Sequence, residues 1–181
     1  MAIIGISGAQ STGKSTLLNA LRSEPFFKEY FVGDEVTRRV KSYGLPINED
    51  GTDVTQRLIM QEHIVNVFMH SNLLTDRTAL DGLIYTKELQ QRGMIKNQST
   101  VDFAIDVFNK LAPMYDVIFY IRPEFDIEAD GVRSVDKQFR DNVAEAFENA
   151  YNQYHNNLLN LVPITGSVRD RIDQVLNYLR K

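Results

Sequence analysis

The chain has 181 residues, of which 43% are hydrophobic and 24% charged, as is ordinary for one globular domain. Its net charge of −4 gives no general attraction to nucleic acid or anionic membranes, and the lack of cysteine excludes disulfides and thiolate metal sites. No apolar run approaches the roughly 20 residues of a membrane span, and no basic segment typical of a signal peptide opens the chain. We therefore expect one cytoplasmic domain over residues 1–181 without a membrane partner; composition leaves the oligomeric state open.

The first predicted elements surround a glycine-rich loop. An apolar run from Ile3 to Ile6 predicts a buried strand, and the residues after Ser15 predict a helix that ends near Arg22. Between them, residues 8–15 read Gly-Ala-Gln-Ser-Thr-Gly-Lys-Ser and fit G-x-x-x-x-G-K-[ST] at every fixed position. In this context backbone N–H groups converge on phosphate oxygens, and the helix N-terminus adds partial positive charge. The sequence therefore predicts a nucleoside triphosphate site.

The loop also assigns roles to its side chains. Lys14 is expected to reach the β- and γ-phosphates, and the Ser15 hydroxyl to ligate Mg²⁺. Gly8 and Gly13 permit a close backbone approach that a Cβ would prevent. We expect ATP and Mg²⁺ as cofactors, with nucleotide contacts from Gly8, Ala9, Gln10, Ser11, Thr12, Gly13, Lys14, Ser15 and Thr16.

The rest of the chain alternates predicted strands and helices. Further strands are expected at residues 30–32, 73–75, 116–121 and 161–165, with helices at 55–69, 81–91, 99–111, 139–158 and after 167. Ser99 is the expected cap of its helix, and Leu58, Val65 and Met69 form one apolar stripe on another. The glycines and proline between Ser42 and Thr52 indicate a loop.

This alternation predicts an α/β fold in three layers, with a five-stranded parallel sheet covered by helices on both faces. Ligands of such sheets bind at the carboxyl ends of the strands. We therefore expect one crevice bordered by the glycine-rich loop, Glu35, Asp76 with Arg77, Arg122 and Gly166.

Four further stretches accompany the loop: Glu35 after the second strand, Asp76-Arg77-Thr78 after the third, Asp130-Gly131-Val132-Arg133, and Val-Pro-Ile-Thr-Gly-Ser at 162–167. Together they resemble the nucleoside and nucleotide kinase branch of P-loop proteins, and within it the ribosylnicotinamide-kinase type and its small AAA-type phage and bacterial relatives. The resemblance covers nearly the whole chain. It implies a nucleotide-kinase fold with a helical lid over approximately residues 124–140.

The resemblance also implies catalytic roles. Glu35 would accept the proton of the acceptor hydroxyl, with Asp34 as its rival, and Asp76 would hold Mg²⁺ through water, unless it only caps the next helix. Arg77 would contact the acceptor or its phosphate. Arg133 would be the lid arginine that closes over the transferring phosphate.

Other residues are candidates for ligand recognition. Gly166 and Ser167 would line the adenine in the resembling kinases. Arg38 and Arg39 suggest an acceptor that carries phosphate, although surface charge explains them equally well. Candidates for contact with the base or sugar are Gln56, Arg57 and Gln61. The three histidines, His63, His70 and His155, lack the spacing of a metal site or catalytic triad.

The sequence therefore predicts a kinase that transfers the γ-phosphate of ATP to a hydroxyl or phosphate of a nucleoside- or nucleotide-type acceptor. A kinase acting within DNA or RNA, at a 5′ end or on a modified base such as a hydroxymethylated pyrimidine, is an alternative that the basic residues near 38–41 keep open. A P-loop ATPase or nucleotide switch is an alternative of another class. The strand at 117–121 ends in Arg122 rather than an acid, and no Asn-Lys-x-Asp is present, so the kinase is favoured.

Overall fold

The computed structural model describes residues 2–33, 36–122, 136–155 and 158–180. Its five strands form one parallel sheet in the order β2-β3-β1-β4-β5. The strands are β1 (Ala2–Ser7), β2 (Phe31–Gly33), β3 (Asn72–Asp76), β4 (Val117–Ile121) and β5 (Leu161–Ile164). The predicted five-stranded parallel sheet is confirmed.

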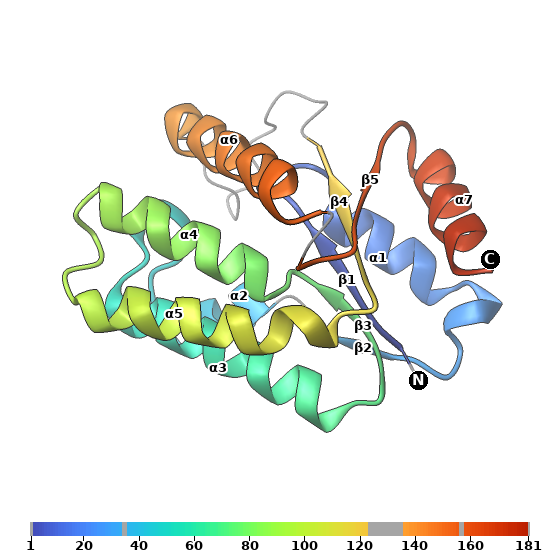
Figure 1. The fold of residues 1–181 in the computed structure, drawn as a ribbon, viewed down its shortest axis with the longest axis horizontal. Coiled ribbons are helices and arrows are strands. Elements are labelled where there is room, and N and C mark those ends of the chain that lie inside the picture. The colour runs from blue at the N-terminus through green and yellow to red at the C-terminus, as the bar shows by residue number, and fades with distance from the viewer. Residues whose placement is uncertain (1, 34–35, 123–135, 156–157, 181) are drawn as a thin grey trace.

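Helices cover both faces of this sheet, as Figure 1 shows. They are α1 (Lys14–Arg22), α2 (Val36–Ser42), α3 (Asp53–Met69), α4 (Ala79–Gln91), α5 (Gln98–Leu111), α6 (Lys137–Tyr154) and α7 (Val168–Leu179). Helices α1 and α7 pack on one face, and α3, α4, α5 and α6 belong to the layer on the other. The three-layer prediction is therefore confirmed. None of the helices in the described ranges is long and apolar enough to cross a membrane.

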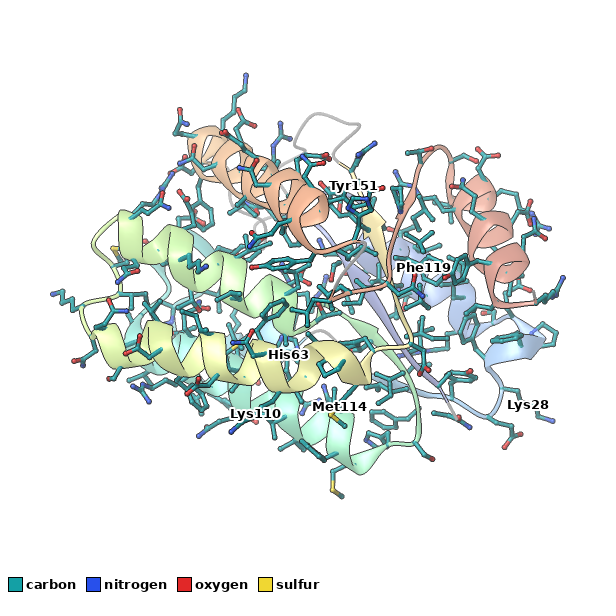
Figure 2. The ribbon with its side chains drawn as sticks, in the orientation of Figure 1. Lys28, His63, Lys110, Met114, Phe119 and Tyr151 are labelled. Carbon is teal, nitrogen blue, oxygen red and sulfur yellow. The ribbon has the colours of Figure 1, made fainter. Side chains whose placement is uncertain are left out.

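The two faces of the sheet have separate apolar cores. On the α1 and α7 side, Phe119 of β4 meets Tyr178 of α7 edge to face, with ring centroids 5.7 Å apart (Figure 2). On the other side, Phe108, Phe139 and Phe147 are fully buried among the helices. Every residue of β4 is buried, which explains why this strand reads as a continuous apolar run.

The strand order places the functional edge of the sheet. From β1 the chain passes to the edge strand β2, returns to β3 on one side of β1, and then crosses to β4 on the other side. In open parallel sheets, ligands bind where the strand order reverses in this way, at the carboxyl ends. The segments that follow β1 and β3 border one crevice.

Several local expectations were wrong. Val65 and Met69 are 51% and 71% exposed, so their stripe does not mark the inner face of α3. The buried residues of this helix are instead Thr55, Gln56, Ile59, Met60, His63, Asn66 and Val67. The segment that carries Arg38 and Arg39 is a helix, α2, that the sequence did not predict. Helix α5 begins at Gln98 with Asn97 as its N-cap, so Ser99 lies inside the helix, where its hydroxyl accepts a hydrogen bond from Arg57.

Candidate active site

The glycine-rich loop joins β1 directly to α1. Gly8 has φ +147°, and a Cβ at this position would lie 2.5 Å from the carbonyl oxygen of Ile121. Gly13 caps α1 with φ +86°, and Leu17 N–H donates to its carbonyl. In the described parts of the chain no side chain caps the start of α1, so its first N–H groups can bind an anionic ligand. The backbone here has the form of a phosphate cradle.

Lys14 lies along the inside of this cradle. Its Nζ donates to the Ala9 carbonyl at 2.6 Å and to Thr12 Oγ1 at 3.4 Å, and the residue is only 6% exposed. A cleft opens over the loop. Its lining includes Gln10, Lys14, Ser15, Arg38, Asn48 and Arg77. The lysine, the start of α1 and two arginines therefore make this cleft suited to phosphate groups.

Ser15 and Asp76 form the second element of the site. Ser15 Oγ donates to Asp76 Oδ2 at 2.8 Å, and Asp76 is 1% exposed at the end of β3. No group of three or more His, Asp or Glu side chains placed to hold a metal occurs in the described parts of the chain. Mg²⁺ is commonly bound by one or two carboxylates together with substrate phosphates and water. A hydroxyl and one buried carboxylate beside a phosphate cleft fit that ion.

Asp81 ties the loop to α4. Its Oδ2 accepts from Ser7 Oγ at 2.6 Å and from the N–H of Thr78 at 3.0 Å, while Oδ1 accepts from the N–H of Gly8 at 3.4 Å. Sequence reasoning treated Asp81 only as the start of a helix. The Thr-x-x-Asp spacing from Thr78 is the signal of the capping box that the structure contains.

Arg77 is held in an unusual backbone conformation. Its φ is +72°, a region that non-glycine residues rarely adopt and that persists where surrounding contacts enforce it. Its N–H donates to the Ile6 carbonyl at 2.9 Å, and its guanidinium lies 4.9 Å from the ring centroid of Tyr85. These contacts place a buried cation at the edge of the phosphate cleft.

A second, smaller cavity adjoins the phosphate cleft. Both have Arg77 and Asn48 in their walls. The lining of the second cavity also includes Gln56, Ile59 and His63 from α3 and Tyr85 from α4. Its mixture of apolar side chains and a few polar groups is typical of a small-molecule site.

His63 gives this cavity an uncharged polar group. The side chain is 1% exposed, and Figure 2 shows it within the helical layer that contains α3, α4 and α5. Burial, with a smaller contribution from Arg77, lowers its pKa to about 3, so the imidazole is neutral at physiological pH. Nε2 is buried without a hydrogen-bond partner among the described residues. Sequence reasoning missed His63, although it follows Gln56 by two helical turns.

Some of the predicted site residues line the two cavities, and others lie away from them. Arg38 lines the phosphate cleft, whereas Arg39 forms a 2.6 Å ion pair with Glu62. Gln56 lines the second cavity, with Oε1 accepting from Thr86 Oγ1 at 3.1 Å, whereas Arg57 donates to Thr100 and Ser99. The remaining candidate on α3, Gln61, is exposed.

Other predicted residues have local partners or lie outside the described ranges. Arg122 binds Glu148, with Nε 2.8 Å from Oε1. Ser167 caps α7 through a reciprocal capping box with Asp170, directly after Gly166 at φ +89°. Asp34, Glu35 and Arg133 lie outside the described residues, as does most of the expected lid, 124–135.

Arg171 contacts the glycine-rich loop, which the sequence did not indicate. This residue of α7 is 2% exposed, and its Nη1 donates to the Thr12 carbonyl at 2.7 Å across 159 positions of sequence. A carbonyl held by this guanidinium cannot turn toward the phosphate side of the loop. Arg171 therefore fixes the orientation of one peptide in the cradle.

The fold is shared with solved kinases. Deoxyadenosine kinase from M. mycoides superimposes with a TM-score of 0.67 at 17% identity, covering 98% of each chain. NadR in complex with NR gives 0.74 at 17% identity, over 99% of this chain and 52% of NadR. Thymidylate kinase from Candida albicans gives 0.61 at 12% identity, over 99% and 91%. A search of curated proteins found no significant match. The family model described as AAA domain matches residues 3–171, and the chain belongs to that family.

Proposed function

We propose that this protein is an ATP-dependent kinase that phosphorylates a nucleoside- or nucleotide-type acceptor. The observation that carries the proposal is the pair of adjoining cavities, which share Arg77 and Asn48. Phosphoryl transfer requires little covalent chemistry from the protein, but it requires donor and acceptor in line and positive charge around the transferring group. Two cavities that meet at a buried arginine supply this arrangement.

On the donor side, the start of α1 and Lys14 would hold the triphosphate of ATP. Ser15 and Asp76 would hold Mg²⁺, which supplies charge neutralisation to the phosphates when bound. Arg171 would hold the Thr12 peptide of the loop in its orientation through the hydrogen bond to the Thr12 carbonyl. For the adenine we retain Gly166 and Ser167 as the proposed contacts.

On the acceptor side, the second cavity would take the base. Its neutral His63 and Gln56 offer hydrogen-bonding groups without charge, and Tyr85 and Ile59 offer apolar surface. Arg77 would then face the reacting end of the acceptor. The similarity to proteins named as kinases of deoxyadenosine and thymidylate is in keeping with such a substrate.

The remaining roles rest on the kinase resemblance. We propose Glu35 as the base that accepts the acceptor proton, with Asp34 as its rival, and Arg133 as the lid cation. Strand β2 ends at Gly33, which pairs with Thr75 of β3 just before Asp76. Glu35 follows that strand end by two positions in the sequence, which supports its assignment to the same edge.

The deciding experiment offers γ-labelled ATP to nucleosides, nucleoside monophosphates, nicotinamide riboside and oligonucleotides, with the Lys14→Ala variant as control. Transfer of label to a free nucleoside or nucleotide, lost in the variant, is the expected result. Transfer only to oligonucleotides would replace the acceptor with a group in DNA or RNA. Release of labelled phosphate without transfer to any acceptor would overturn the kinase in favour of an ATPase or switch.

A further inference from the structure

One side chain of the glycine-rich loop links the lining of the phosphate cleft to the wall of the second cavity. Gln10, the third residue of the loop, is 4% exposed, and its Oε1 accepts a 2.6 Å hydrogen bond from the hydroxyl of Tyr85. Burial raises the pKa of the Tyr85 hydroxyl, which therefore stays protonated and donates. This contact assigns the oxygen end of the Gln10 amide and leaves Nε2 at the other end.

The Nε2 group of Gln10 is a buried donor without a hydrogen-bond partner among the described residues. Leaving such a donor unsatisfied costs free energy, and native proteins rarely do so without a functional reason. Gln10 lines the phosphate cleft, and Tyr85 lines the second cavity. Gln10 therefore joins the wall of the phosphate cleft to that of the second cavity, where the proposed phosphate acceptor would meet the terminal phosphate of ATP.

The neutral chemistry of Gln10 favours one kind of ligand atom. The phosphates already have Lys14, Arg38 and the backbone N–H groups of the cradle, which are cationic or positively polarised. A carboxamide whose oxygen is bound to Tyr85 offers only its uncharged NH₂ group, which is a hydrogen-bond donor. On a nucleoside, the hydrogen-bond acceptor that matches this group is a hydroxyl oxygen of the sugar, because the sugar is the part next to the transferring phosphate.

We infer that Gln10 is a specificity-determining residue, whose Nε2 donates to a sugar hydroxyl of the phosphate acceptor while Tyr85 aims the amide. The inference rests on the proposed function. An acceptor that lacks this hydroxyl leaves the donor unpaired, and sites built to bind a substrate hydroxyl discriminate strongly against analogues without it. The protein therefore distinguishes acceptors by their sugar, independently of how its cavity reads the base.

The test compares a ribonucleoside acceptor with its 2′-deoxy and 3′-deoxy analogues in wild type, Gln10→Leu, Tyr85→Phe and the double variant. In wild type, one analogue should show kcat/KM roughly tenfold below the parent, the scale of one hydrogen bond. Gln10→Leu should lower kcat/KM for the parent nucleoside alone, so that the ratio of kcat/KM between the parent and this analogue comes close to one. Tyr85→Phe should reduce the ratio less, and should add nothing in the Gln10→Leu background, since the two residues act as one unit.

Binding of a non-hydrolysable ATP analogue is measured for every variant, so that a change at the phosphate site is separated from a change in discrimination between acceptors. The inference would be overturned if Gln10→Leu lowered kcat/KM equally for the parent and both analogues. It would also be overturned if Gln10→Leu lost affinity for the ATP analogue instead. Should Gln10→Leu fail to fold, Gln10→Met takes its place. If wild type transfers phosphate to no nucleoside and no nucleotide, the proposed function fails, and calorimetric binding of the same three nucleosides then tests Gln10. In that experiment the inference is overturned if no nucleoside binds, or if Gln10→Leu leaves the ratio of affinities for the parent and its deoxy analogues unaltered.

Discussion

Ser15 Oγ lies 2.8 Å from Asp76 Oδ2, so the first turn of α1 is joined to the end of β3 by a hydroxyl–carboxylate hydrogen bond. The two residues are 61 positions apart, and the parallel pairing of β1 with β3 brings them together. Each is of a residue type that Mg²⁺ accepts as ligand or as partner of its bound water. The pair thus locates the proposed cation beside the phosphate cradle.

We expect Asp76→Asn to weaken the response of phosphate transfer to Mg²⁺, because a neutral amide is a poorer partner for a hard cation. Higher Mg²⁺ should recover part of the lost rate, as measured by titration at saturating ATP. Asp106→Asn, at an exposed position of α5, is the matched control and should behave as wild type. A Mg²⁺ dependence that is the same in Asp76→Asn and wild type would remove Asp76 from the cation site.

Glu35→Gln is expected to fail in a different way. The substitution keeps the shape of the side chain and removes the proton acceptor, so transfer should fall by about 10²–10⁴-fold, the usual scale for general-base catalysis. Binding of ATP with Mg²⁺ should survive, and added Mg²⁺ should recover nothing. Rescue by Mg²⁺ would assign Glu35 to the metal instead, and full activity would direct attention to Asp34.

Lys14→Ala should lower the rate of transfer by on the order of 10²–10³-fold, as for other groups that stabilise charge developing in a transition state. The fold should persist, because Lys14 belongs to neither of the two large apolar cores. Its Nζ donates to the Ala9 carbonyl and to Thr12 Oγ1 in the loop. Circular dichroism and label transfer measure the two effects separately. Lys110→Ala, at an exposed position of α5, is the control (Figure 2). Unimpaired turnover in Lys14→Ala would contradict the site.

Local sequence signals were sufficient for the cradle and the sheet. The loop from Gly8 to Ser15 requires positive φ angles at Gly8 and Gly13, and glycine readily adopts them. Strand β4 is an uninterrupted apolar run because both its faces are covered. The rule that ligands bind at the carboxyl ends of parallel strands predicts the loop and Asp76 along one crevice, and in the structure Ser15 and Asp76 are in contact.

The second cavity could not be predicted in this way, because packing between distant elements creates it. Its inner wall on α3 is a polar face with Gln56 and His63, whereas Val65 and Met69 on the same helix are exposed. Periodicity gives the spacing of a helical face but not which face packs inward. The Arg171 contact to Thr12 likewise depends on how α7 docks against α1, which no local pattern encodes.

Arg171→Leu should raise the KM for ATP and lower stability, since it removes a buried charged hydrogen bond worth about 1.5–3 kcal/mol. Arg171→Lys should restore part of both, because an ammonium can still donate to the Thr12 carbonyl. The control is Arg169→Leu on the same helix, where the side chain is 74% exposed in an ion pair with Asp173. Loss of stability with an unaltered KM for ATP would show that Arg171 serves the core and not the cradle.

His63 gives a prediction about pH and stability. Its folded pKa is about 3 and its unfolded value about 6.5, so below pH 6.5 the unfolded chain binds a proton that the folded chain excludes. The free energy of unfolding therefore decreases as pH falls, and this residue should account for about 2 kcal/mol of the loss between pH 7 and pH 5.

His63→Gln removes that titration while keeping a polar side chain in the cavity. Urea unfolding at pH 7, 6 and 5 should give this variant a shallower loss of stability than wild type, even if its stability at pH 7 is lower. His70→Gln is the control, since it leaves His63 in place and changes a half-buried ring stacked on Phe31. Because carboxylates dominate acid unfolding at lower pH, the comparison is confined to pH 5 and above. Equal slopes in wild type and His63→Gln would mean that the imidazole is protonated in the folded cavity, and its assignment as a neutral hydrogen-bonding group would then be wrong.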